Sequence, residues 1–212
     1  MTQLVPEHPG AASDLATFAR RVARFEPEAV IRIVAEGTVA GCFAETPFDA
    51  LALRAIALAA PLSIDVVVEA GTLAARAVGT NGELELPPAV PALRWTTSLP
   101  PRSGWTERAR LAEPAVARQV AAGVDEFRRR GPDVVTAGLA LREGRAALEA
   151  LAAEIWAREL APGVPLRLAH AAESYGFLSD GDVVLGSLGQ WWRLDASHGS
   201  VLARSGLALF AL

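Results

Sequence analysis

The residues best suited to chemistry lie near the end of the chain, in the stretch GQWWRLDASHGSVLARSG. Its acid, hydroxyls and imidazole, from Asp195, Ser197, His198 and Ser200, are the groups of a Ser–His–Asp hydrolase. Nucleophilic catalysis needs such groups to converge beside an oxyanion hole, and residues this close on one tight turn splay apart. No G-x-S-x-G motif occurs in the chain. We therefore interpret the stretch as a β-hairpin with ordinary turn residues, and we assign no catalytic residue.

Two adjacent tryptophans in this stretch fall on opposite faces of the expected strand. Trp191 shares a face with Arg193, whereas Trp192 shares the face of Leu194 and is expected in the core. A half-covered Trp191 stacked by an arginine would be an ordinary surface feature. The alternative is an interface anchor, because exposed Trp beside Arg is typical of a binding hot spot. We take Trp191, Arg193 and the more distant Trp105 as a possible interface or ligand platform.

Other residues with chemical potential are isolated. His170 and Glu173 are three apart in HAAE, a spacing that two metal ligands can share, but a site needs further ligands and the chain has three histidines. Cys42, the only cysteine, lies in the apolar run VAGCFAE and is predicted to be a buried structural thiol. Three arginines at residues 128–130 could bind phosphate, but we favour a solvated helix C-terminus, where the helix dipole stabilises cations. We predict no metal site and no bound cofactor.

Composition excludes several classes of function. All 20 basic side chains are arginine, so no lysine Schiff base, pyridoxal-phosphate anchor or P-loop lysine exists. The net charge of −4 and the pI near 5.5 provide no general positive field for nucleic acid or anionic lipid. The start of the chain, MTQLVPEHPG, does not resemble a signal peptide, and no apolar run is long enough to span a bilayer. We predict a soluble, cytoplasmic protein.

The first half of the chain, residues 1–100, is predicted to position a sheet. Residues 13–26 show the apolar periodicity of an amphipathic helix with Ser13 as its N-cap. Residues 29–36 and 39–45 are apolar and β-branched, which predicts two strands with a turn at Gly37 and Thr38.

The next segment has a strong helix-start signal. Thr46, Pro47 and Asp49 stand at N-cap and first-turn positions, so a nearly all-apolar helix is predicted to run to about residue 60. Such a helix must be covered on every side, by the protein or by a partner chain. Residues 62–70 alternate as a strand, and residues 71–90 form either a short helix capped by Thr72, which we favour, or a hairpin.

The second half, residues 101–212, is predicted to be helical and to end in a small β unit. Residues 87–105 contain five prolines and connect the halves, with a short strand at 92–97, although one continuous domain is also consistent. Helices are predicted from residue 113 to 131, within 133–160 and at 165–175, and strands near residues 183–186, 190–195 and 200–204. The predicted fold class is α+β, a mixed sheet packed by helices with a small C-terminal antiparallel unit.

Three segments carry a resemblance to a known group of proteins. SLPPRSGW (residues 98–105), SYGFL (174–178) and WWRLDASHGSV (191–201) resemble an uncharacterised family of GC-rich Gram-positive bacteria. The resemblance covers most of the chain and implies a bacterial origin, but it implies no activity and no site residues.

The leading functional hypothesis is a non-catalytic protein that binds a ligand or partner and self-associates as a homodimer or other homo-oligomer. It rests on the apolar helix expected before residue 60, on Trp191 and on the scarcity of reactive groups. One alternative is a DNA-binding regulator of the winged-helix type, with LRLAHAAESYG as recognition helix and the tryptophan hairpin as wing, although positive charge is scarce there. Another is a hydrolase in which Asp65, Glu69, His170 or His198 line one pocket.

Overall fold

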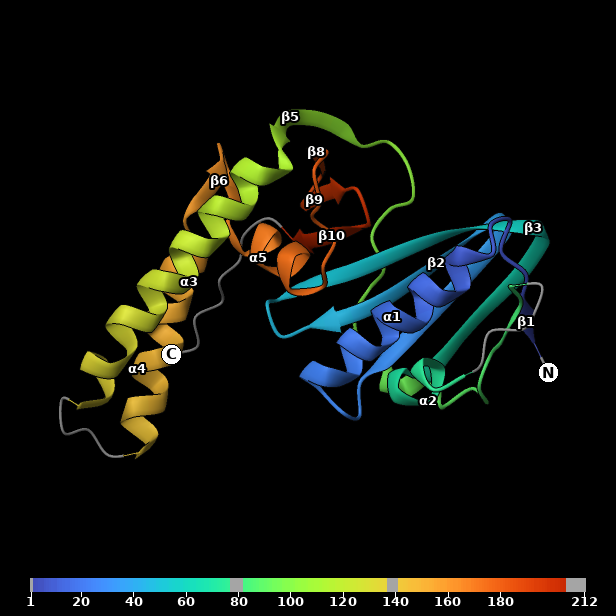
Figure 1. Ribbon diagram of the computed structural model, residues 1–212, viewed down its shortest axis with the longest axis horizontal. Helices are drawn as coiled ribbons and strands as arrows, with labels where there is room; N and C mark the ends of the chain where they lie inside the picture. The colour runs from blue at the N-terminus through green and yellow to red at the C-terminus, as the bar shows by residue number, and fades with distance from the viewer. Residues whose placement is uncertain (1, 77–81, 137–140, 205–212) are drawn as a thin grey trace. The chain divides into compact units, whose positions relative to one another are not determined.

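The computed structural model describes residues 2–76, 82–136 and 141–204 (Figure 1). The chain divides into two compact units, Met1–Arg102 and Ser103–Leu212, which are described separately. Both units combine helices with antiparallel strands, which confirms the α+β class and the antiparallel unit near the C-terminal end. Among the helices that the structure describes, none has the length and apolar character needed to cross a membrane.

A long two-stranded ribbon and one helix form the core of the first unit. In order, this unit contains β1 (Gln3–Leu4), α1 (Gly10–Phe25), β2 (Val30–Thr46), β3 (Ala50–Glu69), α2 (Ala70–Ala74), β4 (Leu84–Glu85) and the 3-10 helix η1 (Ala92–Arg94). Helix α1 lies along the ribbon of β2 and β3 (Figure 1) and buries the predicted apolar stripe, with Leu15, Phe18 and Val22 all fully or nearly fully covered. The stripe therefore predicted this helix correctly, although the helix begins before Ser13.

Strand β2 is continuous where two strands and a turn were predicted. Its pairing with β3 runs from Val30 to Thr46, with a register shift between Gly37 and Val39. Gly37 adopts a φ of 79°, which a residue without a Cβ tolerates, so the irregularity is a β-bulge and not a chain reversal. The prediction of a turn was wrong because β3 is long enough to continue alongside both halves.

The apolar helix predicted for residues 46–60 is also wrong, because this segment begins strand β3. Thr46 does cap a reversal, but it is a hairpin turn: its hydroxyl accepts from the N–H of Phe48 (3.2 Å) and donates to the carbonyl of Ala50 (2.8 Å). Pairing with β2 satisfies the backbone of β3, and this tertiary pairing outweighs the helix propensity of its alanines and leucines. Several apolar residues of the segment are buried, so it no longer argues for a partner chain.

The proline-rich connector is held to the ribbon by specific contacts. The predicted strand at residues 92–97 is wrong, because Ala92–Arg94 form η1 and Trp95 is 7% exposed after it. The guanidinium of Arg94 donates to Glu69 (3.0 Å), and the Val90 N–H donates to the carbonyl of Val67 (2.8 Å). For residues 71–90 we favoured a short helix, and α2 agrees with that prediction, although it begins at Ala70 and not at a cap formed by Thr72. Residues 77–81 of this segment lie outside the described part of the chain.

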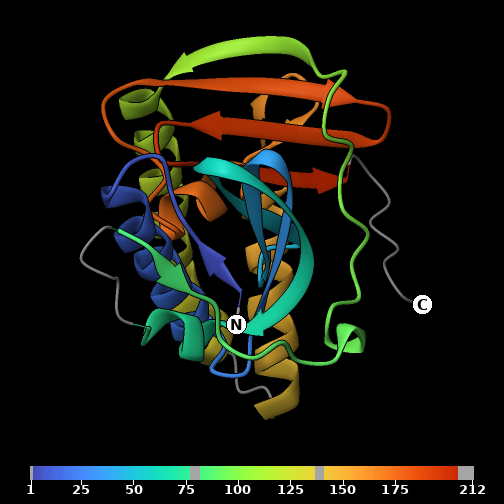
Figure 2. The same cartoon turned by 90° about the vertical axis from the view of Figure 1, so that its right-hand side faces the viewer.

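The second unit joins a four-stranded sheet to three helices. It contains β5 (Thr106–Ala112), α3 (Glu113–Thr136), α4 (Leu141–Trp156), β6 (Glu159–Ala161), β7 (Val164–Pro165), α5 (Arg167–Ser174), β8 (Asp182–Leu188), β9 (Trp191–Ala196) and β10 (Gly199–Arg204). Figure 2 shows β5, β8, β9 and β10 side by side in that order, each antiparallel to its neighbour. The three C-terminal strands and the short helix α5 confirm their predictions, whereas β5 was not predicted.

Helices α3 and α4 run side by side and share an ion-pair network (Figure 1). Glu126 accepts from Arg130 (2.8 Å) and from Arg158 (2.5 Å), and Arg130 also pairs with Glu154 (2.7 Å). Hydrogen bonds from Arg158, and then from Arg130, lower the pKa of Glu126 to about 2. Helix α3 continues past the predicted end at residue 131, so Arg128 and Arg130 are not C-terminal caps but ion-pair partners within and between helices.

Glu113 is the buried anion of the second unit. Its side chain is fully covered, and its carboxylate accepts from the backbone N–H groups of Ser197 (2.6 Å), Ser179 and Gly181 (3.4 Å). Burial alone would raise the pKa of Glu113, but these hydrogen bonds to the charged form outweigh it, and the pKa lies below its usual value. One carboxylate thus fastens the start of α3 to the β9–β10 turn and to the segment before β8.

We expect Glu113→Gln to lower the free energy of unfolding by about 1–3 kcal/mol, because the amide cannot accept as strongly from three N–H groups. Since the folded pKa is depressed, this stabilisation is present above the ordinary Glu pKa and disappears as pH falls through the folded value. Urea unfolding of both proteins from pH 7 to pH 3 measures the difference, which should shrink with acidification.

Glu107→Gln is the matched control, because Glu107 pairs with Arg110 on the exposed surface and should change stability by less than about 0.5 kcal/mol. An equal loss in the two variants, or a loss in Glu113→Gln that persists unchanged at pH 3, would contradict the assigned role of Glu113.

Candidate functional site

Strand β9 presents a covered face and a partly open face. Leu194 is fully buried, together with its partners Leu185 on β8 and Val201 on β10. Trp192 lies on the same face and is half-buried, with its ring beside the β6–β7 turn, where a Cβ on Gly163 would approach it to 3.3 Å. The predicted core position of Trp192 is therefore partly right: its face is the core face, but the ring lies at its margin.

The first tryptophan of the pair stacks with an arginine of the neighbouring strand. Trp191 and Arg204 are direct partners across β9 and β10, so their side chains share a face. The guanidinium carbon of Arg204 lies 5.2 Å from the centroid of the Trp191 ring, within the range of a cation–π interaction. From the sequence we expected an arginine to stack on the Trp191 ring. The arginine that makes this contact is Arg204 of β10.

The second stack joins Trp105 to Arg193. The guanidinium carbon of Arg193 lies 5.7 Å from the centroid of the Trp105 ring, which precedes β5. Between them on β8 is Gly186, the direct partner of Arg193, and a Cβ built on Gly186 would lie 3.9 Å from the Trp105 side chain. The missing side chain leaves the space through which the Trp105 ring reaches Arg193.

Together, Trp105, Trp191, Arg193 and Arg204 form what we call the aromatic–arginine platform. Arg193 is held there by a second contact, since its Nε donates to Asp195 Oδ1 (2.7 Å). The three residues chosen from the sequence all belong to the platform, and Arg204 is the member that sequence reasoning missed. Its strand position directly opposite Trp191 was the available signal, but it required the register of β10 on β9.

The Ser–His–Asp groups beside the platform do not form a triad. The hydroxyl of Ser200 donates directly to Asp195 Oδ1 (2.5 Å) without an imidazole between them. The N–H of Ser197 is bound to Glu113, and the N–H of His198 donates to the carbonyl of Phe177 (3.0 Å) in the turn. These residues hold the β9–β10 turn and the platform arginine, which is the structural role that the sequence favoured.

The remaining candidates for chemistry have structural surroundings. His170 stacks on Trp156, with ring centroids 3.8 Å apart and an interplanar angle of 2°, and burial lowers its pKa to about 4. Cys42 is fully buried, as predicted, and burial raises the pKa of its thiol to about 12, against a smaller opposing effect of Arg54. At neutral pH the His170 imidazole is therefore not a charged acid, and the Cys42 thiol stays protonated and is not the nucleophilic thiolate.

The two carboxylates of the hydrolase alternative are engaged in ion pairs of the first unit. Asp65 accepts from both Arg32 Nε (2.8 Å) and Arg32 Nη2 (2.7 Å), and hydrogen bonding from Arg32 lowers its pKa. Glu69 binds the connector through Arg94. Within residues 2–76, 82–136 and 141–204, no three His, Cys, Asp or Glu side chains gather closely enough to hold a metal ion.

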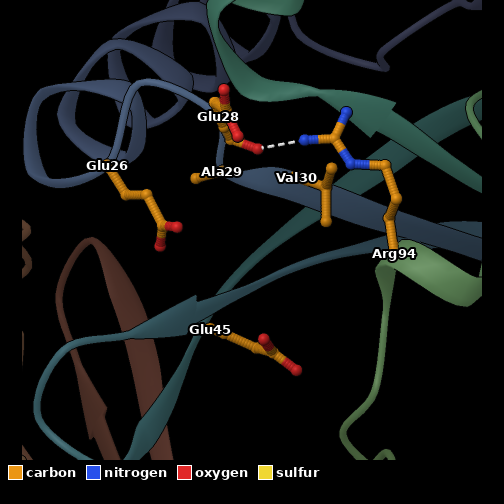
Figure 3. A pocket seen from close by; sticks show the side chains of 6 residues that line it. All are labelled: Glu26, Glu28, Ala29, Val30, Glu45 and Arg94. Carbon is orange, nitrogen blue, oxygen red and sulfur yellow. Dashed lines mark hydrogen bonds between the residues drawn. The ribbon is translucent and has the colours of Figure 1, made fainter.

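A polar cavity of about 210 Å³ lies in the first unit, as Figure 3 shows, and is lined by Glu26, Glu28, Ala29, Val30, Glu45 and Arg94. Two of its lining side chains hold the connector: Arg94 Nη2 donates to the carbonyl of Glu28 (2.5 Å), and Glu45 accepts from the N–H of Thr97 (3.1 Å). The lining contains no serine, cysteine or histidine. We therefore assign the cavity to fastening the connector and not to a reaction.

Family models match both units of the chain. The model described as a domain of unknown function (DUF8185) matches residues 100–208, slightly more than half of the chain, and the chain belongs to this family. A second model, a domain of unknown function (DUF8010), matches residues 1–97. No curated protein matches the sequence. The bacterial origin implied by the sequence resemblance stays a prediction.

The fold resembles that of DNA polymerase sliding clamps. The clamp from Pseudomonas aeruginosa gives a TM-score of 0.52 at 13% identity, over 94% of this chain and 64% of the clamp. The DNA polymerase III beta subunit from Thermotoga maritima gives 0.52 at 10%, over 99% and 66%, and the Bartonella birtlesii clamp bound to griselimycin gives 0.52 at 13%, over 99% and 66%. This chain thus spans somewhat less than two thirds of each of these proteins, and at such identities the likeness establishes the fold alone.

The role of Gly186 in the platform is testable. We expect Gly186→Ala to leave the Trp105–Arg193 stack intact, because a methyl group would make ordinary contacts at 3.6–3.9 Å. Gly186→Leu should displace the ring. A double-mutant cycle with Trp105→Ala and Arg193→Ala should therefore give a coupling of about 0.5–1 kcal/mol in the Gly186→Ala background and none in the Gly186→Leu background. Equal coupling in both would mean that Gly186 does not control the stack.

Proposed function

We propose that this chain is a soluble, cytoplasmic, non-catalytic protein that associates with a further copy of itself or with a partner protein. The observation that carries the proposal is the aromatic–arginine platform, in which two tryptophan–arginine stacks lie on the face of the β5–β8–β9–β10 sheet opposite Leu194. Tryptophan and arginine are among the residues most enriched in binding hot spots.

The platform is suited to binding because its members are partly exposed and already oriented. Trp105, Trp191 and Arg193 are each half-buried, and Arg204 is exposed. The carboxylate of Asp195 fixes the Arg193 guanidinium, so docking a partner would immobilise little additional side-chain freedom. A partner would also remove water from both cation–π contacts, which strengthens them.

The surroundings of the reactive groups support the non-catalytic part of the proposal. The neutral His170 imidazole is stacked on Trp156, the Cys42 thiol is buried, and Asp65 is paired with Arg32. A hydrolase would need several such groups to converge on a substrate, and each of these is engaged in local packing or pairing.

The fold likeness supports an assembly role. The similar structures are named as sliding clamps and beta subunits of DNA polymerases. We extend this to the present chain as an accessory subunit whose partner docks on the platform.

The winged-helix alternative loses support because its recognition helix is not available. Four residues of α5 are buried, and two of its side chains that could read bases are engaged: Arg167 donates to the carbonyl of Arg204 (3.3 Å), and His170 stacks on Trp156. A helix that reads DNA must present such side chains to a groove.

We expect Trp191→Ala to weaken association by about thirtyfold or more, because truncating a central aromatic anchor costs at least about 2 kcal/mol at hot-spot positions. Sedimentation of the full chain over a concentration series measures self-association, and affinity capture with the wild-type chain followed by titration measures a partner.

Trp192→Ala is the matched control, since this neighbouring ring lies on the core face. It should lower the stability of the protein but leave the association constant unchanged. A wild-type chain that stays monomeric and binds no partner, or equal effects of the two substitutions on association, would contradict the proposed function.

A further inference from the structure

One leucine of the first unit is displayed almost completely to solvent. Leu93 lies in the turn formed by residues 91–94, which we call the Leu93 turn, and its 90% exposure is the highest among the large apolar residues of the described chain. The sequence carries no charge from Leu86 to Leu93, and the neighbouring Pro91 and Ala92 are also exposed. An exposed apolar patch of this kind, rimmed by polar residues, is typical of a contact with another protein.

The Leu93 turn is fastened to the rest of the first unit. The N–H of Arg94 donates to the carbonyl of Pro91 (3.0 Å), and its guanidinium donates to Glu69 (3.0 Å). The next residue, Trp95, is 7% exposed and anchors the end of the turn. Leu93 is therefore presented in a fixed position, and covering it with a partner would cost little conformational entropy.

Carboxylates outnumber guanidinium groups beside the Leu93 turn. Arg94 shares the lining of the polar cavity with Glu26, Glu28 and Glu45, so one positive side chain stands among three negative ones (Figure 3). Glu69, which pairs with Arg94, is a fourth carboxylate of this surface. A surface that covers the turn should therefore offer an apolar contact together with a positive charge.

The aromatic–arginine platform has this complementary character. Its two indole rings are half-buried, and Leu188, the direct partner of Trp191 on β8, adds another half-buried apolar side chain. Of its two arginines, Arg193 is matched by Asp195, whereas the Arg204 guanidinium has no carboxylate partner among the described residues. The platform thus combines apolar surface for a leucine with an unmatched positive charge.

We propose that the Leu93 turn of one copy docks on the aromatic–arginine platform of a second copy, with Leu93 against the indole rings and Arg204 beside the glutamates. This inference rests on the proposed self-association and names the occupant of the platform. The contact joins two different surfaces, so a copy whose turn is bound still has a free platform. Two copies can therefore exchange both contacts, or further copies can add to the first two.

Mixing two defective variants tests this arrangement. Leu93→Glu and Trp191→Ala should each weaken self-association at least about tenfold in sedimentation, because every contact between identical copies then lacks one of its two surfaces. The Trp191→Ala chain retains an intact turn, and the Leu93→Glu chain retains an intact platform. An equimolar mixture, with one variant fluorescently labelled, should therefore associate again, and this restoration also shows that both variants are folded.

A charge reversal tests the role of Arg204. Arg204→Glu places a carboxylate beside the glutamates of the turn and should weaken association about tenfold, whereas Arg204→Lys keeps the charge and should retain most of the association. Arg108→Glu is the matched control, because Arg108 donates to Ser187 Oγ (2.7 Å), and Ser187 lies opposite Trp192 on the core face of the same sheet. This control should leave association unchanged.

The outcomes separate this inference from the proposed function. Association that is lost in Trp191→Ala but retained in Leu93→Glu, or a mixture of the two variants that restores nothing, would overturn docking of the Leu93 turn. A wild-type chain that is monomeric throughout the concentration series would overturn it as well, whereas the proposed function fails only if the platform also binds no partner protein.

Discussion

The second unit depends on the alternation of side chains along β9, held between β8 and β10. Because successive residues point to opposite faces, one face contributes Leu194 to the core and the other carries Trp191 and Arg193. A shift of one residue in either pairing would exchange these faces, burying a guanidinium and exposing the apolar residues. The same pairing that builds the core therefore creates the platform.

Several polar groups that suggest chemistry in the sequence serve to fasten segments. Glu113 binds backbone N–H groups from two loops, Asp195 holds Arg193, and Glu45 binds the connector. Buried or half-buried polar groups need such partners, since an unsatisfied one destabilises the fold. Because the chain has no lysine, its ion pairs with Asp and Glu side chains are formed by arginine. The planar guanidinium group suits paired hydrogen bonds such as those that Arg32 donates to Asp65.

The sequence by itself determined the elements with strong local signals. The apolar stripe of α1, the three short C-terminal strands and the burial of Cys42 follow from periodicity and composition, and the opposite faces of Trp191 and Trp192 follow from strand geometry. These features depend on neighbours in the chain, so local reasoning reaches them.

Only the tertiary structure decided the states of residues 37–38 and 46–60 and the partners within the platform. A cap at Thr46 suits a helix or a hairpin, and alanine-rich residues after it prefer a helix until β2 supplies hydrogen bonds along their whole length. Likewise, Arg204 lies far from Trp105 in sequence. Arg204 joins the platform because the register of β10 places it opposite Trp191, and Trp105 joins it because Gly186 leaves space for its ring. Pairing between distant segments sets these features, and no local pattern encodes which segments pair.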